Sequence, residues 1–135
     1  MKKLLSFIAL MFAFVAISSA QSVAMTGSGD SLSNTATKTV TTRVTGTPTA
    51  VSVSYVLTKS TGTPAGTAYL QGSADGGLTY VTIQTTDTLK VTNVTTNKKV
   101  WVVSSPKNYT HYRVTYTGVG TMKVYIAAYI LVRKD

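Results

Sequence analysis

Residues 66–83, G-T-A-Y-L-Q-G-S-A-D-G-G-L-T-Y-V-T-I, constrain the fold of this chain more than any other stretch. Two short runs of β-forming residues, 67–71 and 78–83, flank a segment rich in Ser, Asp and Gly. Asp followed by Gly is a strong hairpin signal, because Gly adopts a positive φ at almost no cost and Asp tolerates it. The sequence therefore predicts a β-hairpin in the middle of the chain, with Asp75 as a turn residue.

Short runs of alternating apolar and polar residues recur along the rest of the chain, separated by Gly, Pro and Asn. In one of them Val51, Val53, Tyr55 and Leu57 alternate with serines, which is the pattern of a strand with one buried face. Residues 35–135 are predicted to form about eight strands with no helix between them. The expected fold class is all-β, a single antiparallel β-sandwich of jelly-roll type preceded by an N-terminal apolar leader.

Residues 1–20 contain two lysines, an apolar run over 4–17 and the small residues Ser18, Ser19 and Ala20. These are the three parts of a secretory signal peptide, and cleavage after Ala20 would leave Gln21 at the N-terminus. An uncleaved membrane anchor is the alternative, because the apolar run has about the shortest length that spans a bilayer. Residues 21–34 are rich in Ser, Gly and Thr and are predicted to be a flexible arm.

The chain has a formal net charge of +9 and no cysteine. The absence of cysteine excludes disulfides, thiolate metal sites and cysteine nucleophiles. The charge indicates an anionic partner such as an acidic glycan or an acidic protein. The alternative is that single basic residues keep the strands soluble and protect their edges. Nucleic-acid binding is not predicted, because the basic residues do not interleave with aromatic ones.

Catalysis is not predicted, because the ionisable residues that it would need are too few. His111 is the only histidine, and the only acids are four aspartates, with no nucleophile elbow in the chain. Asp75 and Asp87 could contribute to a calcium site, but the D-x-D-x-D spacing of a dedicated calcium loop is missing. We therefore expect no enzyme activity, no metal and no cofactor.

The last strand-like run, 121–132, is apolar on both faces, which predicts a strand that is central in a sheet or buried against a neighbouring subunit. Tyr125, Tyr129 and Leu131 lie on the face opposite Met122 and Val124 and are candidate interface residues. The alternative is that the two tyrosines form a second layer of the core. Residues 100–103 are also apolar on both faces, and Trp101 is a further interface candidate.

Tyr80, Tyr109 and Tyr112 are candidates for stacking on a sugar ligand. The alternative is that they are half-buried packing residues with the hydroxyl at the rim of the sandwich.

Three motifs in residues 49–132 resemble those of small β-sandwich accessory or decoration proteins of tailed-phage virions. They are the L-Q-G-S-x-D-G hairpin, a later Y-x-x-Y-R-V strand and the ending G-x-G-T-x-x-V-x-I. The S-x-D-G element is also similar to discoidin-type carbohydrate- or lipid-binding sandwiches, with Tyr80 where those often have Trp. The leader resembles the Bacteroidetes type and departs from the phage pattern, because virion proteins assembled in the cytoplasm need no export signal.

The resemblance implies a non-enzymatic structural or decoration subunit, located in a phage virion and acting through protein–protein contacts. Its partners would be other virion or surface proteins, including further copies of itself, with membrane contact only through residues 1–20 if these are retained. The alternative is an exported bacterial surface protein or carbohydrate-binding module, secreted or on the cell surface, which could bind an acidic glycan.

Overall fold

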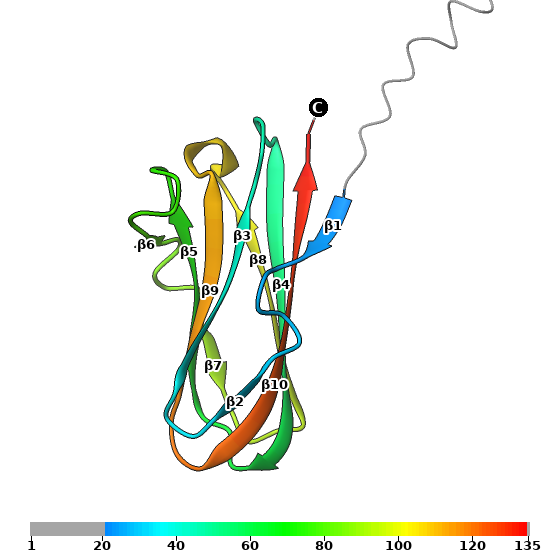
Figure 1. The fold of residues 1–135 in the computed structure, drawn as a ribbon, viewed down its shortest axis with the longest axis vertical. Helices are drawn as coiled ribbons and strands as arrows, with labels where there is room; N and C mark the ends of the chain where they lie inside the picture. The colour runs from blue at the N-terminus through cyan, green and yellow to red at the C-terminus, as the bar shows by residue number, and fades with distance from the viewer. Residues whose placement is uncertain (1–20, 135) are drawn as a thin grey trace, which may run out of the picture.

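The computed structural model describes residues 21–134, which form two antiparallel β-sheets packed face to face (Figure 1). The leader predicted over 1–20 lies outside the described residues. The regular elements of the described residues are strands, apart from one 3-10 turn, η1 (Pro106–Asn108). The strands are β1 (Gln21–Ala24), β2 (Ser31–Ser33), β3 (Thr37–Arg43), β4 (Ala50–Gly62), β5 (Gly66–Ser73), β6 (Val81–Thr82), β7 (Leu89–Val91), β8 (Thr96–Val103), β9 (His111–Gly118) and β10 (Met122–Arg133).

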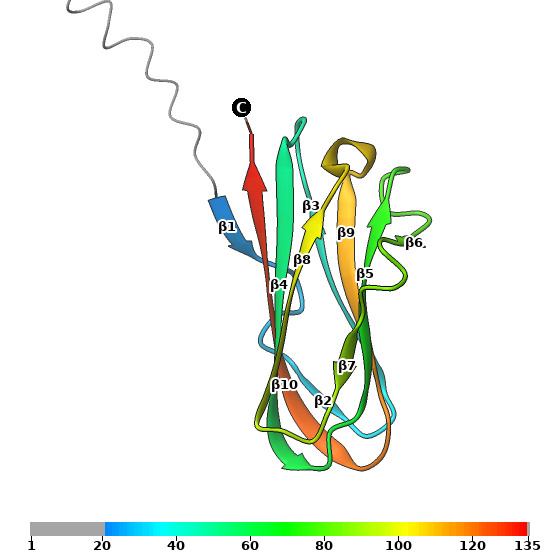
Figure 2. The same cartoon turned by 180° about the vertical axis from the view of Figure 1, so that it is seen from behind.

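The order of the strands is that of a jelly roll. In the first sheet, sheet A, the order is β1-β10-β4-β8, and β2 also pairs with β10. In the second, sheet B, the order is β3-β9-β5-β6, and β7 also pairs with β5. Strands β1 and β2 are therefore two parts of one interrupted strand, and so are β6 and β7. Strands β7 and β8, which belong to different sheets, lie side by side (Figure 2). The prediction of an all-β antiparallel sandwich is confirmed.

The core lies between the inner faces of the two sheets and follows the predicted alternation. In β4, Val51, Val53, Tyr55 and Leu57 are buried, while the residues between them are half-buried on the outer face. Strands β9 and β10 contribute in the same way, and each buried aliphatic or aromatic side chain stabilises the fold by about 1.5–3 kcal/mol. The inward residues of these two strands are Tyr112, Val114, Tyr116, Met122, Val124, Ile126, Ala128 and Ile130.

The expected flexible arm, residues 21–34, is instead held along β10. Strand β1 pairs with it from Gln21, opposite Val132, to Ala24, opposite Tyr129, and β2 pairs with it further along. Met25 and Leu32 are buried. A segment with so few bulky residues can be ordered in this way because main-chain hydrogen bonds supply the pairing and the two buried side chains anchor it.

The hairpin predicted over 66–83 is present, with a shorter second strand than the sequence indicated. Strands β5 and β6 pair through Gln71, opposite Thr82, and through Gly72, opposite Val81. Residues 74–80 form a loop between them in which Gly76 and Gly77 have positive φ. The Asp-Gly-Gly sequence thus makes a wide loop instead of a two-residue turn.

Candidate functional site

The outer face of sheet A exposes large apolar side chains on two of its strands. Tyr125, Tyr129 and Leu131 on β10 are 47%, 45% and 41% exposed. Val100 and Val102 on β8 are 58% and 64% exposed. We call these five residues the sheet A surface. Such exposure is unusual for residues of this size on regular strands and marks a candidate contact region.

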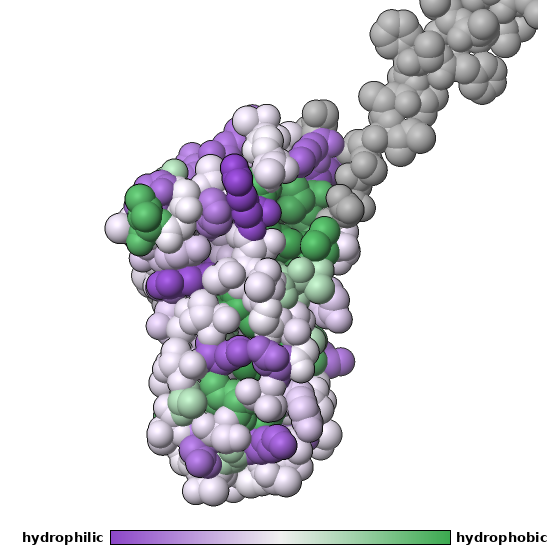
Figure 3. All heavy atoms as spheres, viewed as in Figure 1, coloured by the Kyte–Doolittle hydropathy of each residue, from purple (hydrophilic) through white to green (hydrophobic). Residues whose placement is uncertain are grey.

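These residues face the same way on strands that are joined through β4. Leu131 lies opposite Ser52, which in turn lies opposite Val102. One row further along, Tyr129, Ser54 and Val100 are aligned in the same way. The serines of β4 are half-buried, so a row of short polar side chains lies between two rows of larger apolar ones. Figure 3 shows a different apolar area, where β1 lies beside the end of β10; Val23 of β1 is 44% exposed but lies opposite the inward-facing Ile130, so it is not part of the sheet A surface.

The charged side chains on the same face of sheet A are cations. Lys123 lies beside the surface, with its Nζ 5.9 Å from the ring centroid of Tyr125. Lys98 of β8 lies in the same row as Val56 of β4, on the outer face. No aspartate occupies an outward position of β4, β8 or β10. The sheet A surface is therefore apolar with a basic border.

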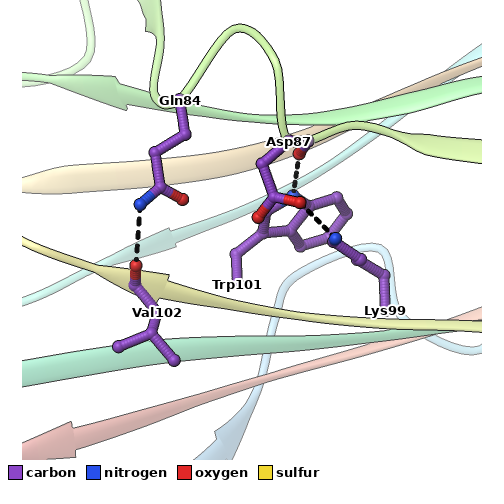
Figure 4. A network of polar contacts seen from close by, with 5 residues as sticks. All are labelled: Gln84, Asp87, Lys99, Trp101 and Val102. Carbon is purple, nitrogen blue, oxygen red and sulfur yellow. Dashed lines mark hydrogen bonds and ion pairs between the residues drawn. The ribbon is translucent and has the colours of Figure 1, made fainter.

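Trp101, predicted from sequence as an interface residue, is instead part of the core and fully buried. Its indole N–H donates to the main-chain oxygen of Asp87 at 2.5 Å, and the Asp87 carboxylate pairs with Lys99 (Figure 4). Gln84 donates its side-chain amide to the carbonyl of Val102 at 3.2 Å, so the β6–β7 connection covers the edge of β8. Because Trp101 faces inward, the adjacent Val102 faces outward.

Two of the three tyrosines predicted to stack on a ligand are committed to packing. Tyr112 is fully buried and donates its hydroxyl to the carbonyl of Pro106 at 3.0 Å; burial raises its pKa to about 12. Tyr109 packs edge-on against the ring of Tyr112, with centroids 5.9 Å apart, and lies against the core. Tyr112 therefore presents no ring face to a sugar, and Tyr109 is half-buried.

The third tyrosine, Tyr80, is covered by an arginine. The guanidinium carbon of Arg113 lies 3.9 Å from the centroid of the Tyr80 ring. Arg113 Nε also donates to Gln71 Oε1 at 2.6 Å, and the Thr115 hydroxyl donates to the same oxygen at 3.3 Å. Tyr80 comes from the loop after β5, Gln71 from β5 and Arg113 from β9, so the cluster lies on the outer face of sheet B.

Asp75 organises the loop between β5 and β6, as the sequence predicted for a turn residue. Its Oδ1 accepts hydrogen bonds from the Ser73 hydroxyl at 2.6 Å and from the main-chain N–H groups of Leu78 and Thr79. Its Oδ2 accepts from the N–H and hydroxyl of Thr79. The bonds from Ser73 and Thr79 hold the pKa of the Asp75 carboxyl well below its usual range.

The remaining candidates from sequence form no recognisable reaction centre in the described residues. His111 Nδ1 lies 3.0 Å from the hydroxyl of Thr110. Asp75 is engaged in its own loop and Asp87 with Lys99. Between residues 21 and 134 no three His, Cys, Asp or Glu side chains are grouped as a metal site would require. No helix in this part of the chain could span a membrane.

No known protein family matches the sequence, and no curated protein is similar to it in sequence. Among solved structures, the VP2 subviral particle of infectious bursal disease virus is similar to 87% of this chain, with a TM-score of 0.55 and 13% identity. This chain spans only 33% of that protein. At this identity the similarity shows a shared fold.

Two further solved structures have lower TM-scores. A family 16 carbohydrate-binding module has a TM-score of 0.47 at 16% identity, over 81% of this chain and 82% of the module. A pilus protein of Bacillus endospore appendages has a TM-score of 0.47 at 12% identity, over 86% of this chain and 87% of that protein.

Proposed function

We propose that the protein is a non-enzymatic structural or decoration subunit of a phage virion, and that the sheet A surface binds another protein of the particle. The observation that carries the proposal is the exposure of Tyr125, Tyr129 and Leu131 beside Val100 and Val102 on one regular sheet face. Apolar patches with a polar border are typical of protein–protein contacts, and tyrosine contributes strongly to them. The resemblance of the hairpin and late-strand motifs to phage accessory proteins supports the virion as the location.

The charges of this face favour a different protein over a second copy as the partner. If two copies paired through the sheet A surface about a two-fold axis, the charged side chains brought together would all be cations, such as Lys98 and Lys123, and would repel each other. A partner with carboxylates around an apolar centre would neutralise them. Self-association, which the resemblance also implies, would then use other surfaces of the chain.

A second candidate function is that of an exported surface protein, and the observation that favours it is the leader-like sequence of residues 1–20. The two candidates differ in where the chain is found and where it begins. Export with cleavage would give a mature protein that starts at Gln21, whereas a retained leader would leave Met1 in place.

The test is to purify particles from a producing culture and to measure the chain's copies per particle by mass spectrometry, together with its N-terminal residue. A double variant, Tyr129→Ser with Leu131→Ser, should lower the copy number about tenfold or more, because contact residues of this kind contribute most of the binding energy. Val119→Ser is the matched control, since Val119 is 57% exposed in the β9–β10 turn, away from the sheet A surface. Absence of the wild-type chain from particles, or equal loss in both variants, would contradict the proposal.

A further inference from the structure

The guanidinium of Arg113 is fixed in place by two neighbours. Gln71 accepts a hydrogen bond from its Nε, and the ring of Tyr80 lies against one of its faces. Neither contact uses the edge formed by Nη1 and Nη2, which is the edge that can hold a carboxylate by two parallel hydrogen bonds. An arginine held in this way loses less side-chain entropy when it binds such a group.

The three carboxylates of the described chain are engaged elsewhere. Asp30 pairs with Lys38 at 2.5 Å, and Asp87 pairs with Lys99. Asp75 accepts its hydrogen bonds from the residues of its own loop. None of these three carboxylates forms an ion pair with Arg113.

A second cation lies on the neighbouring strand. Thr41 of β3 is directly opposite Arg113 of β9, and Arg43 is directly opposite His111. Side chains opposite each other on adjacent strands have Cβ atoms about 5 Å apart, and diagonal neighbours remain within reach of long side chains. Arg43 and Arg113 can therefore approach the same ligand, with the hydroxyl of Thr41 beside them.

The rest of this face carries hydroxyl groups instead of large apolar side chains. Its outward positions on β3, β9 and β5 include no exposed large apolar residue. A protein partner usually buries such residues at the centre of its contact, and the outer face of sheet A has them whereas the outward positions of β3, β9 and β5 do not. The hydroxyl groups of the outer face of sheet B belong to Thr37, Thr39, Thr41, Thr67, Tyr69, Thr115 and Thr117.

We propose that the outer face of sheet B binds the carboxylates of an acidic polysaccharide, with Arg113 as the main contact and Arg43 beside it. Gln71 and Tyr80 are positioning residues that hold the guanidinium. Because this surface lies on the other side of the sandwich from the sheet A surface, a subunit bound to a particle through sheet A would still present it. The inference thus goes beyond the structural role and does not depend on it.

The test measures binding of the full chain to sodium polygalacturonate by isothermal titration, with neutral dextran, dextran sulfate and poly-glutamate as comparison ligands. Arg113→Gln should weaken binding to polygalacturonate about tenfold or more, since it removes a charge-assisted bidentate contact. Arg113→Lys keeps the charge and should still lose most of the affinity, because a lysine cannot make the forked contact. Gln71→Ala leaves the net charge unchanged and should weaken binding about threefold by releasing the guanidinium.

Lys98→Gln is the matched control, because it removes one positive charge from sheet A. It should leave the affinity for polygalacturonate within about twofold of that of the wild type at physiological salt. Equal losses in Lys98→Gln and Arg113→Gln would overturn the proposal in favour of general charge attraction, and so would tighter binding to dextran sulfate. Equal or tighter binding to poly-glutamate would overturn it in favour of an acidic peptide. Thermal unfolding of each variant shows that it is folded, and the result is independent of particle assembly.

Discussion

The rings of Tyr55 and Trp101 pack together on the inner face of sheet A, with centroids 6.2 Å apart and planes tilted by 55°. Their polar groups have different surroundings. The indole N–H of Trp101 donates to the carbonyl of Asp87, whereas the buried hydroxyl of Tyr55 has no hydrogen-bond partner among residues 21–134. Burial also raises the pKa of Tyr55 well above its usual range. Of these two packed rings, Trp101 thus has its polar group hydrogen-bonded and Tyr55 does not.

Removing the Tyr55 hydroxyl should therefore leave the protein equally stable or more stable, by up to about 1 kcal/mol, because an unpaired buried polar group is costly. Urea unfolding of Tyr55→Phe measures this. Tyr116→Phe is the matched control, because the Tyr116 hydroxyl donates to the carbonyl of Ala65 at 2.7 Å, and its loss should cost about 1 kcal/mol. The interpretation is wrong if both variants lose the same stability.

The buried tyrosines should also make the fold sensitive to alkali. Burial raises the pKa of both Tyr112 and Tyr116 to about 12, above the usual value of about 10. Between these values the unfolded chain has released protons that the native chain still holds, so stability is complete below about pH 10 and falls as the pH rises toward 12. The urea midpoint, measured across this range, should fall in the wild type and fall less in Tyr116→Phe. An unchanged wild-type midpoint would contradict the prediction.

Much of the fold could be predicted because side-chain alternation reports burial directly. The residues at 51, 53, 55 and 57 face the core as their period of two requires. The two halves of the first strand, β1 and β2, could not be recognised from the sequence. Both are held by main-chain pairing with β10, which leaves little trace in the sequence. Only Met25 and Leu32, isolated bulky residues in a polar segment, indicated it.

The candidate surfaces depend on features that a sequence expresses less clearly. Residues 100–103 are apolar throughout, so alternation could not tell which face of β8 is buried, and the structure places Trp101 inside and Val102 outside. The contact of Tyr80 with Arg113 requires the pairing of β5 with β9 and the path of the loop over 74–80. The pairing of β5 with β9 joins residues far apart in the chain, such as Gln71 and Arg113, so no local sequence pattern shows it.

Gly66 should tolerate substitution much less well than Gly76, although both have positive φ. At Gly66 φ is +133°, and an added Cβ would lie 2.1 Å from the carbonyl oxygen of Thr117. Gly66→Ala should cost about 2–4 kcal/mol, because both the backbone and the paired strand must shift. Gly76 lies in the open loop with no atom within 4 Å of an added Cβ, so Gly76→Ala should cost only about 1 kcal/mol for its backbone conformation. Equal losses in urea unfolding would show that the close approach to β9 is not the cause.

Asp75 should make the stability of the fold depend on acid. Hydrogen bonds from Ser73 and Thr79 to the charged carboxylate lower its pKa, whereas in the unfolded chain an Asp has a pKa of about 3.9. As the pH falls, the unfolded chain takes up a proton before the native chain does. The contribution of Asp75 is therefore complete above about pH 5 and is lost as the pH falls below 4 toward the lower native value.

Asp75→Asn tests this, because the amide keeps the shape of the side chain but lacks the charge. The variant should have a lower urea midpoint than the wild type at pH 7, since an amide nitrogen replaces an oxygen that accepts from Thr79. The difference between the two midpoints should shrink steadily as the pH is lowered from about 5 to about 2. A difference that stays constant over this range would mean that the loop is held by the shape of the side chain and the glycines around it, and not by the carboxylate charge.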